Sequence, residues 1–201
     1  MSKIKDKERQ LYEIASTQQG YFTSRQAVAA GYSYRMQSYH KTQGHWKEID
    51  HGIYRINNYP DSPQEDLVIC SLWSSNKKMP QAVISHETAL SVYGLGDIMP
   101  QKIHCIIPPK FRKKSKAYIL HRSFIKDEET AEMEGFRITK PLRTMIDAAE
   151  GSLSVEELEK AFRGAIKKGY FVPADVIKIS MSAQAKEKMR SYIRDLIDAE
   201  R

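Results

Sequence analysis

Apolar and polar residues between Tyr21 and Ile56 follow a pattern of two short helices and a hairpin. Ser24 predicts the N-cap of the first helix, and Gly31 predicts its end because glycine adopts the left-handed conformation freely. Ser33 predicts the N-cap of a second helix over residues 34–42. Two short helices joined by a tight glycine-containing turn are typical of the helix-turn-helix, whose second helix enters the major groove of DNA. One side of the first helix carries the apolar residues Ala27, Val28 and Ala30.

A hairpin and a preceding helix extend this pattern. Two short β-type runs, residues 46–49 and 53–56, flank Asp50-His51-Gly52, and a glycine-containing loop between such runs is a hairpin signal. A hairpin that directly follows a recognition helix is a wing. An earlier helix over residues 5–17 would complete a three-helix core, with an apolar stripe of Leu11, Ile14 and Ala15.

The rest of the chain mixes helices and strands after a turn-rich segment, residues 57–63. A helix is expected from Pro63 to about Ser75, capped by Asp61 or Ser62. Beyond it the pattern predicts strands at 82–84, 103–107, 117–122 and 135–138, and helices at 141–149, 155–168, 173–179 and 184–199. The expected fold class is α+β: an N-terminal winged helix-turn-helix domain (residues 1–60), a mixed α+β C-terminal domain (61–180) and a helical C-terminal tail (181–201).

Composition fits a soluble globular protein of one or two domains. Of the 201 residues, 41% are hydrophobic and 28% charged, and the apolar runs fall far short of the ~20 residues that cross a bilayer. The charged N-terminus is unlike a signal peptide. Cys70 and Cys105 lie in apolar runs and are expected to be buried thiols, which favours a cytoplasmic location and no membrane partner.

A net charge of +7 favours a polyanionic partner. Residues 1–60 hold nine Lys and Arg against five Asp and Glu, and residues 101–126 hold eight Lys and Arg and no acidic residue. The second stretch contains a candidate second basic surface for DNA, RNA or protein, with a solvated loop as the alternative. Its members are Lys110, Arg112, Lys113, Lys114 and Lys116.

The second short helix carries the side chains expected to read DNA. Its first two turns meet base edges in this geometry, so Arg35 is a candidate for guanine and Gln37 for adenine. The alternative is that Tyr34 and Tyr39 are partly core and that Arg55 only flanks a strand. Met36 and Trp46 are expected in the core. The candidate DNA-binding residues, for bases or phosphates, are Ser24, Arg25, Ser33, Tyr34, Arg35, Gln37, Ser38, Lys41, Lys47, His51 and Arg55.

Catalytic and metal-binding patterns are weak. Consecutive residues at a helix start cannot form a triad, so Ser85-His86-Glu87 predicts capping by Ser85 and a structural hydrogen bond from His86. The six histidines show no paired ligand spacing with the cysteines, and His40 and His45 are expected to face solvent or DNA. A metal-dependent nuclease needs carboxylates on its strands, and residues 103–107 have none. We therefore expect no catalytic activity, no metal and no cofactor.

The chain resembles the AbiEi antitoxins of type IV toxin–antitoxin (abortive infection) systems. The N-terminal block FTSRQAVAAGYSYRMQSYHKTQGHWKEIDHGIYRI is similar to the winged helix of that family and closes on Gly52-Ile53-Tyr54-Arg55. Further on, VISHETALSVYGLGDIMPQKIHCIIPP and TKPLRTMIDAAEG resemble the strand-helix-strand block of the family and the helix that follows it. Together these blocks cover roughly residues 8–177.

The resemblance implies a transcriptional repressor of phage-defence type that binds double-stranded DNA at its own operator, with inverted repeats as the expected site. It also implies a neighbouring nucleotidyltransferase-type toxin that the second domain counteracts, with or without direct contact. Two alternatives stay open: a winged-helix module for protein or RNA contacts, and a winged helix fused to a divalent-metal nuclease-like domain. Steep salt dependence together with a preference for one sequence would favour the DNA-binding regulator.

Overall fold

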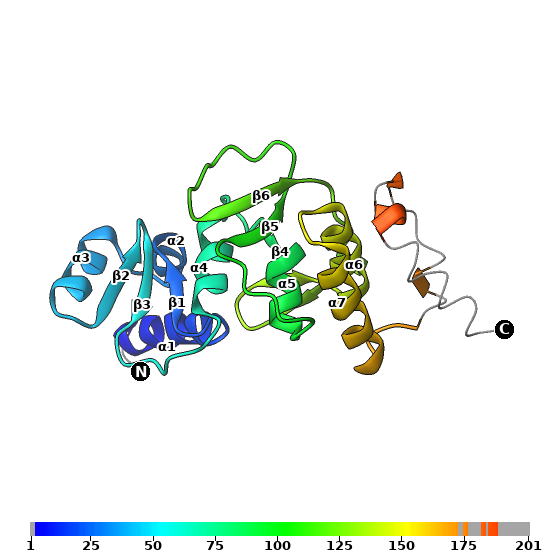
Figure 1. Cartoon of the computed structure of the whole chain (residues 1–201). Coiled ribbons are helices and arrows are strands. Elements are labelled where there is room, and N and C mark those ends of the chain that lie inside the picture. Colours follow the sequence, from blue (N-terminus) through cyan, green and yellow to red (C-terminus); the bar gives the residue numbers. More distant parts are fainter. Residues whose placement is uncertain (1–2, 173–174, 177–181, 184, 189–201) are drawn as a thin grey trace. The chain divides into compact units, whose positions relative to one another are not determined.

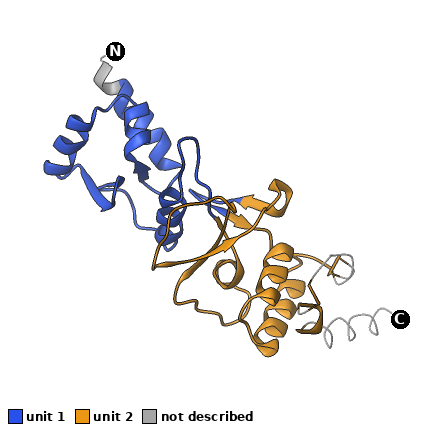
Figure 2. Ribbon diagram, turned by 90° about the horizontal axis from the view of Figure 1, so that it is seen from above, with its two compact units in different colours: residues 1–82, 132–137 blue, residues 83–131, 138–201 orange. Residues whose placement is uncertain are grey.

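The computed structural model describes residues 3–172, 175–176, 182–183 and 185–188. The chain forms two compact units, coloured separately in Figure 2. Unit 1 comprises residues 1–82 and 132–137, and unit 2 comprises residues 83–131 and 138–201. Helices and strands are mixed along the chain, which confirms the α+β class. The helices predicted at 173–179 and 184–199, and the predicted tail, fall largely outside the described residues.

Unit 1 combines a small antiparallel sheet with helices that flank it (Figure 1). The strands lie in the order β1-β3-β2. The first three helices and the hairpin agree with the predicted elements to within two residues. Strand β1 was not predicted, because three residues are too few to show an alternating pattern. The elements are α1 (Lys3–Ser16), β1 (Tyr21–Thr23), α2 (Ser24–Ala29), α3 (Tyr34–Thr42), β2 (Trp46–Asp50), β3 (Ile53–Ile56) and α4 (Glu65–Trp73).

An aromatic core holds unit 1 together. The ring of Phe22 is fully buried and lies edge-on to Trp46, with 4.9 Å between ring centroids. Burying each large apolar side chain of this kind contributes about 1.5–3 kcal/mol. Val28 was predicted to share the apolar side of α2, but it is 44% exposed because a six-residue helix turns only one narrow face inward. The buried members of the cluster are Leu11, Ala15, Phe22, Ala27, Ala30, Tyr32 and Trp46.

Local capping sets the turn between α2 and α3. The N-cap of α2 is Thr23, whereas the sequence predicted Ser24. Gln26 N donates to Thr23 Oγ1 at 3.2 Å, and Thr23 N donates to Gln26 Oε1 at 2.7 Å. Ser24 is therefore the first residue of the helix. Ser33 caps α3 as predicted, accepting from Met36 N at 3.3 Å, and Gly31 has the predicted left-handed backbone, with φ +92°.

Helix α4 begins later than the sequence predicts and extends unit 1. Its N-cap is Gln64, because the Glu65 carboxylate accepts from Ser62 N at 3.1 Å and holds the preceding residues in a turn. Buried side chains of α4 pack against β1 and β3. Unit 1 consequently continues to Ala82, past the predicted boundary at residue 60. The assignment of separate functions to residues 1–60 and 61–180 stays a prediction.

Unit 2 is built around a sheet in the order β6-β5-β4-β8-β7, with helices α5, α6 and α7. Strand β4 pairs antiparallel with β5, and β5 pairs parallel with β6. Strand β7 was not predicted, and the strand predicted at 135–138 begins later because Gly135, with φ +90°, forms a turn. The elements are β4 (Val83–Ile84), α5 (His86–Tyr93), β5 (Ile103–Ile107), β6 (Tyr118–Arg122), η1 (Asp127–Glu129), β7 (Thr130–Glu132), β8 (Arg137–Thr139), α6 (Pro141–Glu150) and α7 (Val155–Lys167).

The helices of unit 2 enclose a second core. Helix α7 starts at a capping box in which Glu157 N donates to Ser154 Oγ at 3.2 Å and Ser154 N donates to Glu157 Oε2 at 3.0 Å. Its inward face packs with α5 and α6 around Leu90, Met145 and Phe162, each at most 1% exposed. Cys70 and Cys105 are buried, as predicted. Within the described residues, no helix is both long and apolar enough to span a membrane.

Candidate nucleic-acid interface

The inner face of α3 is fixed by a buried amide. Gln37 is 2% exposed: Ser24 Oγ donates to its Oε1 at 2.6 Å, and its Nε2 donates to the backbone oxygens of Ser24 and Tyr32, each at 3.2 Å. The prediction that Gln37 reads an adenine is therefore corrected, because its amide forms hydrogen bonds that join α3 to α2 and to the turn before α3. Ser24 also joins the hairpin, since its N–H donates to Gly52 O at 2.8 Å.

The outer face of α3 presents a polar and aromatic surface. Tyr34 is 70% exposed and Tyr39 57%, which disfavours the alternative that they are partly core. Arg35 and Ser38 are exposed between them, as the predicted readout requires. Ser33 is also exposed, with its hydroxyl engaged as the N-cap. An exposed helix face of this width is what the major groove admits.

The hairpin adds exposed polar groups next to α3. Lys47 on β2 and His51 at the turn are exposed, and Gly52 turns the chain with φ +70°. Lys41 at the end of α3 forms an exposed ion pair with Glu48 on β2, at 2.8 Å. The hydrogen bond in that pair raises the pKa of Lys41 and lowers the pKa of Glu48. Part of the positive charge predicted for Lys41 is therefore offset by its neighbour.

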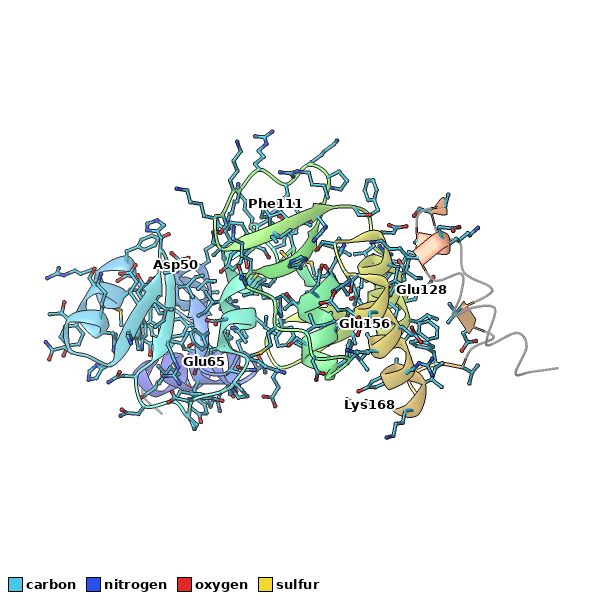
Figure 3. All side chains as sticks on the ribbon, in the orientation of Figure 1. Asp50, Glu65, Phe111, Glu128, Glu156 and Lys168 are labelled. Carbon is cyan, nitrogen blue, oxygen red and sulfur yellow. The ribbon has the colours of Figure 1, made fainter. Side chains whose placement is uncertain are left out.

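Two of the predicted DNA-binding arginines have partners inside unit 1. The Arg55 side chain is only 12% exposed, and its guanidinium lies 2.7 Å from Asp61 and 3.2 Å from Glu65, the latter labelled in Figure 3. It also donates to Tyr59 O at 2.9 Å. The prediction that Arg55 binds phosphate is corrected, because ion pairs already neutralise it. Arg25 is exposed and donates to Asn76 O at 2.8 Å.

The second basic surface lies in unit 2, on the connection between β5 and β6. Phe111 anchors this connection: its ring is 7% exposed, and its carbonyl accepts from Arg122 Nη1 at 2.8 Å. Around Phe111 in Figure 3, long side chains ending in nitrogen extend outward. The basic residues are exposed, so the anchored backbone presents them together. We call residues 110–116 the basic loop; its charged members are Lys110, Arg112, Lys113, Lys114 and Lys116.

Unit 2 also contains a buried polar cluster that the sequence only partly reveals. Ser85 occupies the N-cap position of α5 but makes no capping hydrogen bond, contrary to the prediction; its Oγ lies 2.9 Å from His86 Nδ1. The His86 ring stacks on His121 with centroids 3.5 Å apart. His104 Nδ1 lies 2.7 Å from Glu87 Oε2 and 3.2 Å from His121 Nε2. Strands β5 and β6 thus bring two histidines to the residues at the start of α5.

Burial and hydrogen bonds together set the ionisation of His86 and Glu87 in this cluster. Burial lowers the pKa of His86 to about 3, with the neighbouring His121 contributing, and it also lowers the pKa of His121. For Glu87, burial favours the neutral form, but hydrogen bonds from His104 and Ser152 outweigh it and the pKa falls to about 2. Ser85 is fully buried and has no access to a substrate. The cluster is therefore a structural network in which His86 is neutral and Glu87 is ionised at neutral pH.

Comparison with known proteins finds a family match for the N-terminal part of the chain. Residues 9–57, from α1 to the end of β3, match the family described as "Transcriptional regulator, AbiEi antitoxin". Over these residues the match confirms the resemblance to the AbiEi antitoxins; the resemblance of the two later blocks stays a prediction. It covers about a quarter of the chain and falls on the helices and hairpin described above. This segment is therefore similar to antitoxins described as transcriptional regulators.

The remaining comparisons are more distant. The crystal structure of the RV2827C protein from Mycobacterium tuberculosis is 12% identical, with a TM-score of 0.45, over 91% of this chain and 80% of that one. No curated protein matches the sequence.

Proposed function

We propose that the chain is a sequence-specific DNA-binding antitoxin that represses its own operon. In this proposal α2 and α3 form a helix-turn-helix, α3 enters the major groove, and the β2–β3 hairpin serves as the wing. The observation that carries the proposal is the division of α3 into two faces. Gln37 ties the inner face to α2, while Tyr34, Arg35 and Ser38 are exposed on the outer face.

Each exposed group has a distinct role in this proposal. Arg35 is suited to bidentate recognition of a guanine, and a good pair of this kind contributes about 1–3 kcal/mol of discrimination. Lys47 and His51 on the hairpin contact phosphates, which position the protein without reading sequence. Lys41 contributes less charge than its residue type suggests, because Glu48 is its partner. The match to AbiEi regulators over residues 9–57 supports the same assignment.

Unit 2 is proposed to carry the antitoxin activity against a nucleotidyltransferase-type toxin and to have no catalytic activity of its own. The basic loop supplies a second surface for a polyanion. The buried Ser85-His86-Glu87 cluster is consistent with a non-catalytic unit, because its serine is inaccessible.

The test is a gel-shift with the purified full-length protein on the DNA directly upstream of its gene, with random-sequence competitor, at two salt concentrations. The expected result is a shift that survives competitor and weakens steeply as salt rises. Binding of operator and competitor with equal affinity at both salt concentrations would overturn the proposal. It would favour a module for protein or RNA contacts instead.

A further inference from the structure

The C-terminus of α3 brings two histidines together in a way that their sequence spacing does not suggest. His40 Nδ1 and His45 Nδ1 lie 3.1 Å apart. His45 is exposed, and His40 stacks on the buried ring of Trp46 at 4.6 Å, which fixes the plane of its imidazole. Both rings line a hollow of 430 Å³ in unit 1, so space for further ligands lies beside them.

Backbone geometry explains the pairing. Helix α3 ends in a Schellman motif, in which His45 N donates to His40 O at 3.0 Å and Gly44 N donates to Lys41 O at 3.1 Å. Gly44 supplies the left-handed residue of the motif, with φ +73°. This motif brings the side chains at its two ends into contact, usually as an apolar pair. Here both ends are histidines, so the turn itself holds two imidazoles side by side.

We propose that His40 and His45 form a binding site for a divalent transition-metal ion such as Zn²⁺, Ni²⁺ or Cu²⁺. With metal–nitrogen bonds of about 2.05 Å, a separation of 3.1 Å gives an N–metal–N angle of about 100°, between the octahedral and tetrahedral values. Imidazole nitrogen is a preferred ligand of these three ions. Both Nδ1 atoms bind through their lone pairs, so the proton now shared between them moves to the Nε2 atom of its own ring.

The site offers two protein ligands, and water completes the coordination shell. Among the described residues, no group of three or more His, Cys, Asp or Glu side chains is arranged to hold a metal ion. Affinity in the micromolar range is therefore expected, well below that of a structural zinc site. A bound ion would cross-link the last turn of α3 to the residue before β2 and so stabilise unit 1.

Calorimetric titration of the untagged full-length protein with ZnCl₂, in a non-chelating buffer at neutral pH, tests the site. One equivalent of bound Zn²⁺ is expected, and His45→Gln is expected to weaken binding by at least about tenfold. Because His45 is exposed, this change leaves the core intact. The matched control is His51→Gln, an exposed histidine at the hairpin turn, which should retain the wild-type affinity.

Variants of Gly44 test whether the backbone turn positions the two histidines, because they change the turn and leave both ligands in place. A side chain at residue 44 meets nothing within 4 Å, so Gly44→Ala perturbs only the backbone, whereas Gly44→Asn tolerates the left-handed conformation. Zn²⁺ affinity should fall several-fold in the alanine variant and persist in the asparagine variant. Absence of Zn²⁺ binding by the wild type, or unchanged binding after His45→Gln, would overturn the proposal. Neither outcome bears on DNA recognition, which the gel-shift measures separately.

Discussion

Replacing Gln37 by methionine tests whether the buried amide positions α3. Methionine keeps the length and approximate volume of the side chain but removes one acceptor and two donors, together three hydrogen bonds. At about 0.5–1.5 kcal/mol for each bond, Gln37→Met should destabilise unit 1 by about 2–4 kcal/mol. Ser24→Ala removes only the bond from the hydroxyl, so its cost should be about 1 kcal/mol.

The assay is urea denaturation followed by tryptophan fluorescence. Both tryptophans of the chain, Trp46 and Trp73, belong to unit 1, so their emission reports on that unit alone. Free energies of unfolding come from linear extrapolation, and an unchanged slope shows that the extent of unfolding is the same. The double variant Ser24→Ala/Gln37→Met should cost less than the sum of the single variants, because they share one hydrogen bond.

A second readout connects this stability to recognition. At temperatures where the variant is folded, Gln37→Met should reduce operator binding more than binding to random DNA, because α3 loses its fixed orientation. A loss of stability below about 0.5 kcal/mol, or no greater than that of Ser24→Ala, would refute the reasoning that the amide holds α3 in place.

Three further predictions concern DNA contact and pH. In anisotropy titrations, Arg35→Ala should relax operator specificity by about 1–3 kcal/mol. Lys47→Ala should weaken binding to operator and random DNA alike and reduce the slope of log affinity against log salt concentration by about one. Equal losses on both DNAs for Arg35→Ala would contradict these roles. Neutralising the basic loop with glutamines should weaken DNA binding or abolish rescue from the toxin, and a variant unchanged in both assays would remove the loop from the mechanism. The pKa of His86 is lowered from 6.5 to about 3, so the folded state binds fewer protons than the unfolded state below pH 6.5. The free energy of unfolding should therefore fall as the pH drops below 6.5, by about 2 kcal/mol at pH 5. Asparagine tolerates the positive φ of residue 86, so His86→Asn should reduce this pH dependence of the unfolding temperature in calorimetry. Parallel pH profiles for the variant and the wild type would disprove the prediction.

Local signals made much of the N-terminal unit predictable. Ser33 accepts from the N–H three residues later, and Gly31 has the positive φ that ends α2, so both features depend on neighbours in the chain. The exchange of Ser24 for Thr23 as the cap of α2 shows the limit of such reasoning. Both residues can accept a hydrogen bond, and only the reciprocal bond from Gln26 selects Thr23.

Long-range contacts account for the corrections at the interface. Gln37 looked like a base-reading residue, yet it reaches Ser24, thirteen residues earlier in the chain. Arg55 looked like a phosphate ligand, yet it is neutralised by Glu65, ten residues later. A sequence pattern indicates which face of a short helix or strand is polar, but it does not show which polar residues are already paired within the fold.

The sequence by itself determined the order of helices and strands around the turn, the excess of basic residues and the resemblance to AbiEi regulators. Periodicity, capping residues and glycines express these features over a few neighbouring residues. Only the tertiary structure decided that Gln37 is buried, that His86 stacks on His121, and that His40 and His45 meet at the end of α3. Hydrogen bonds and ring contacts depend on distances of a few ångströms, and those distances are set by packing and backbone turns rather than by residue type.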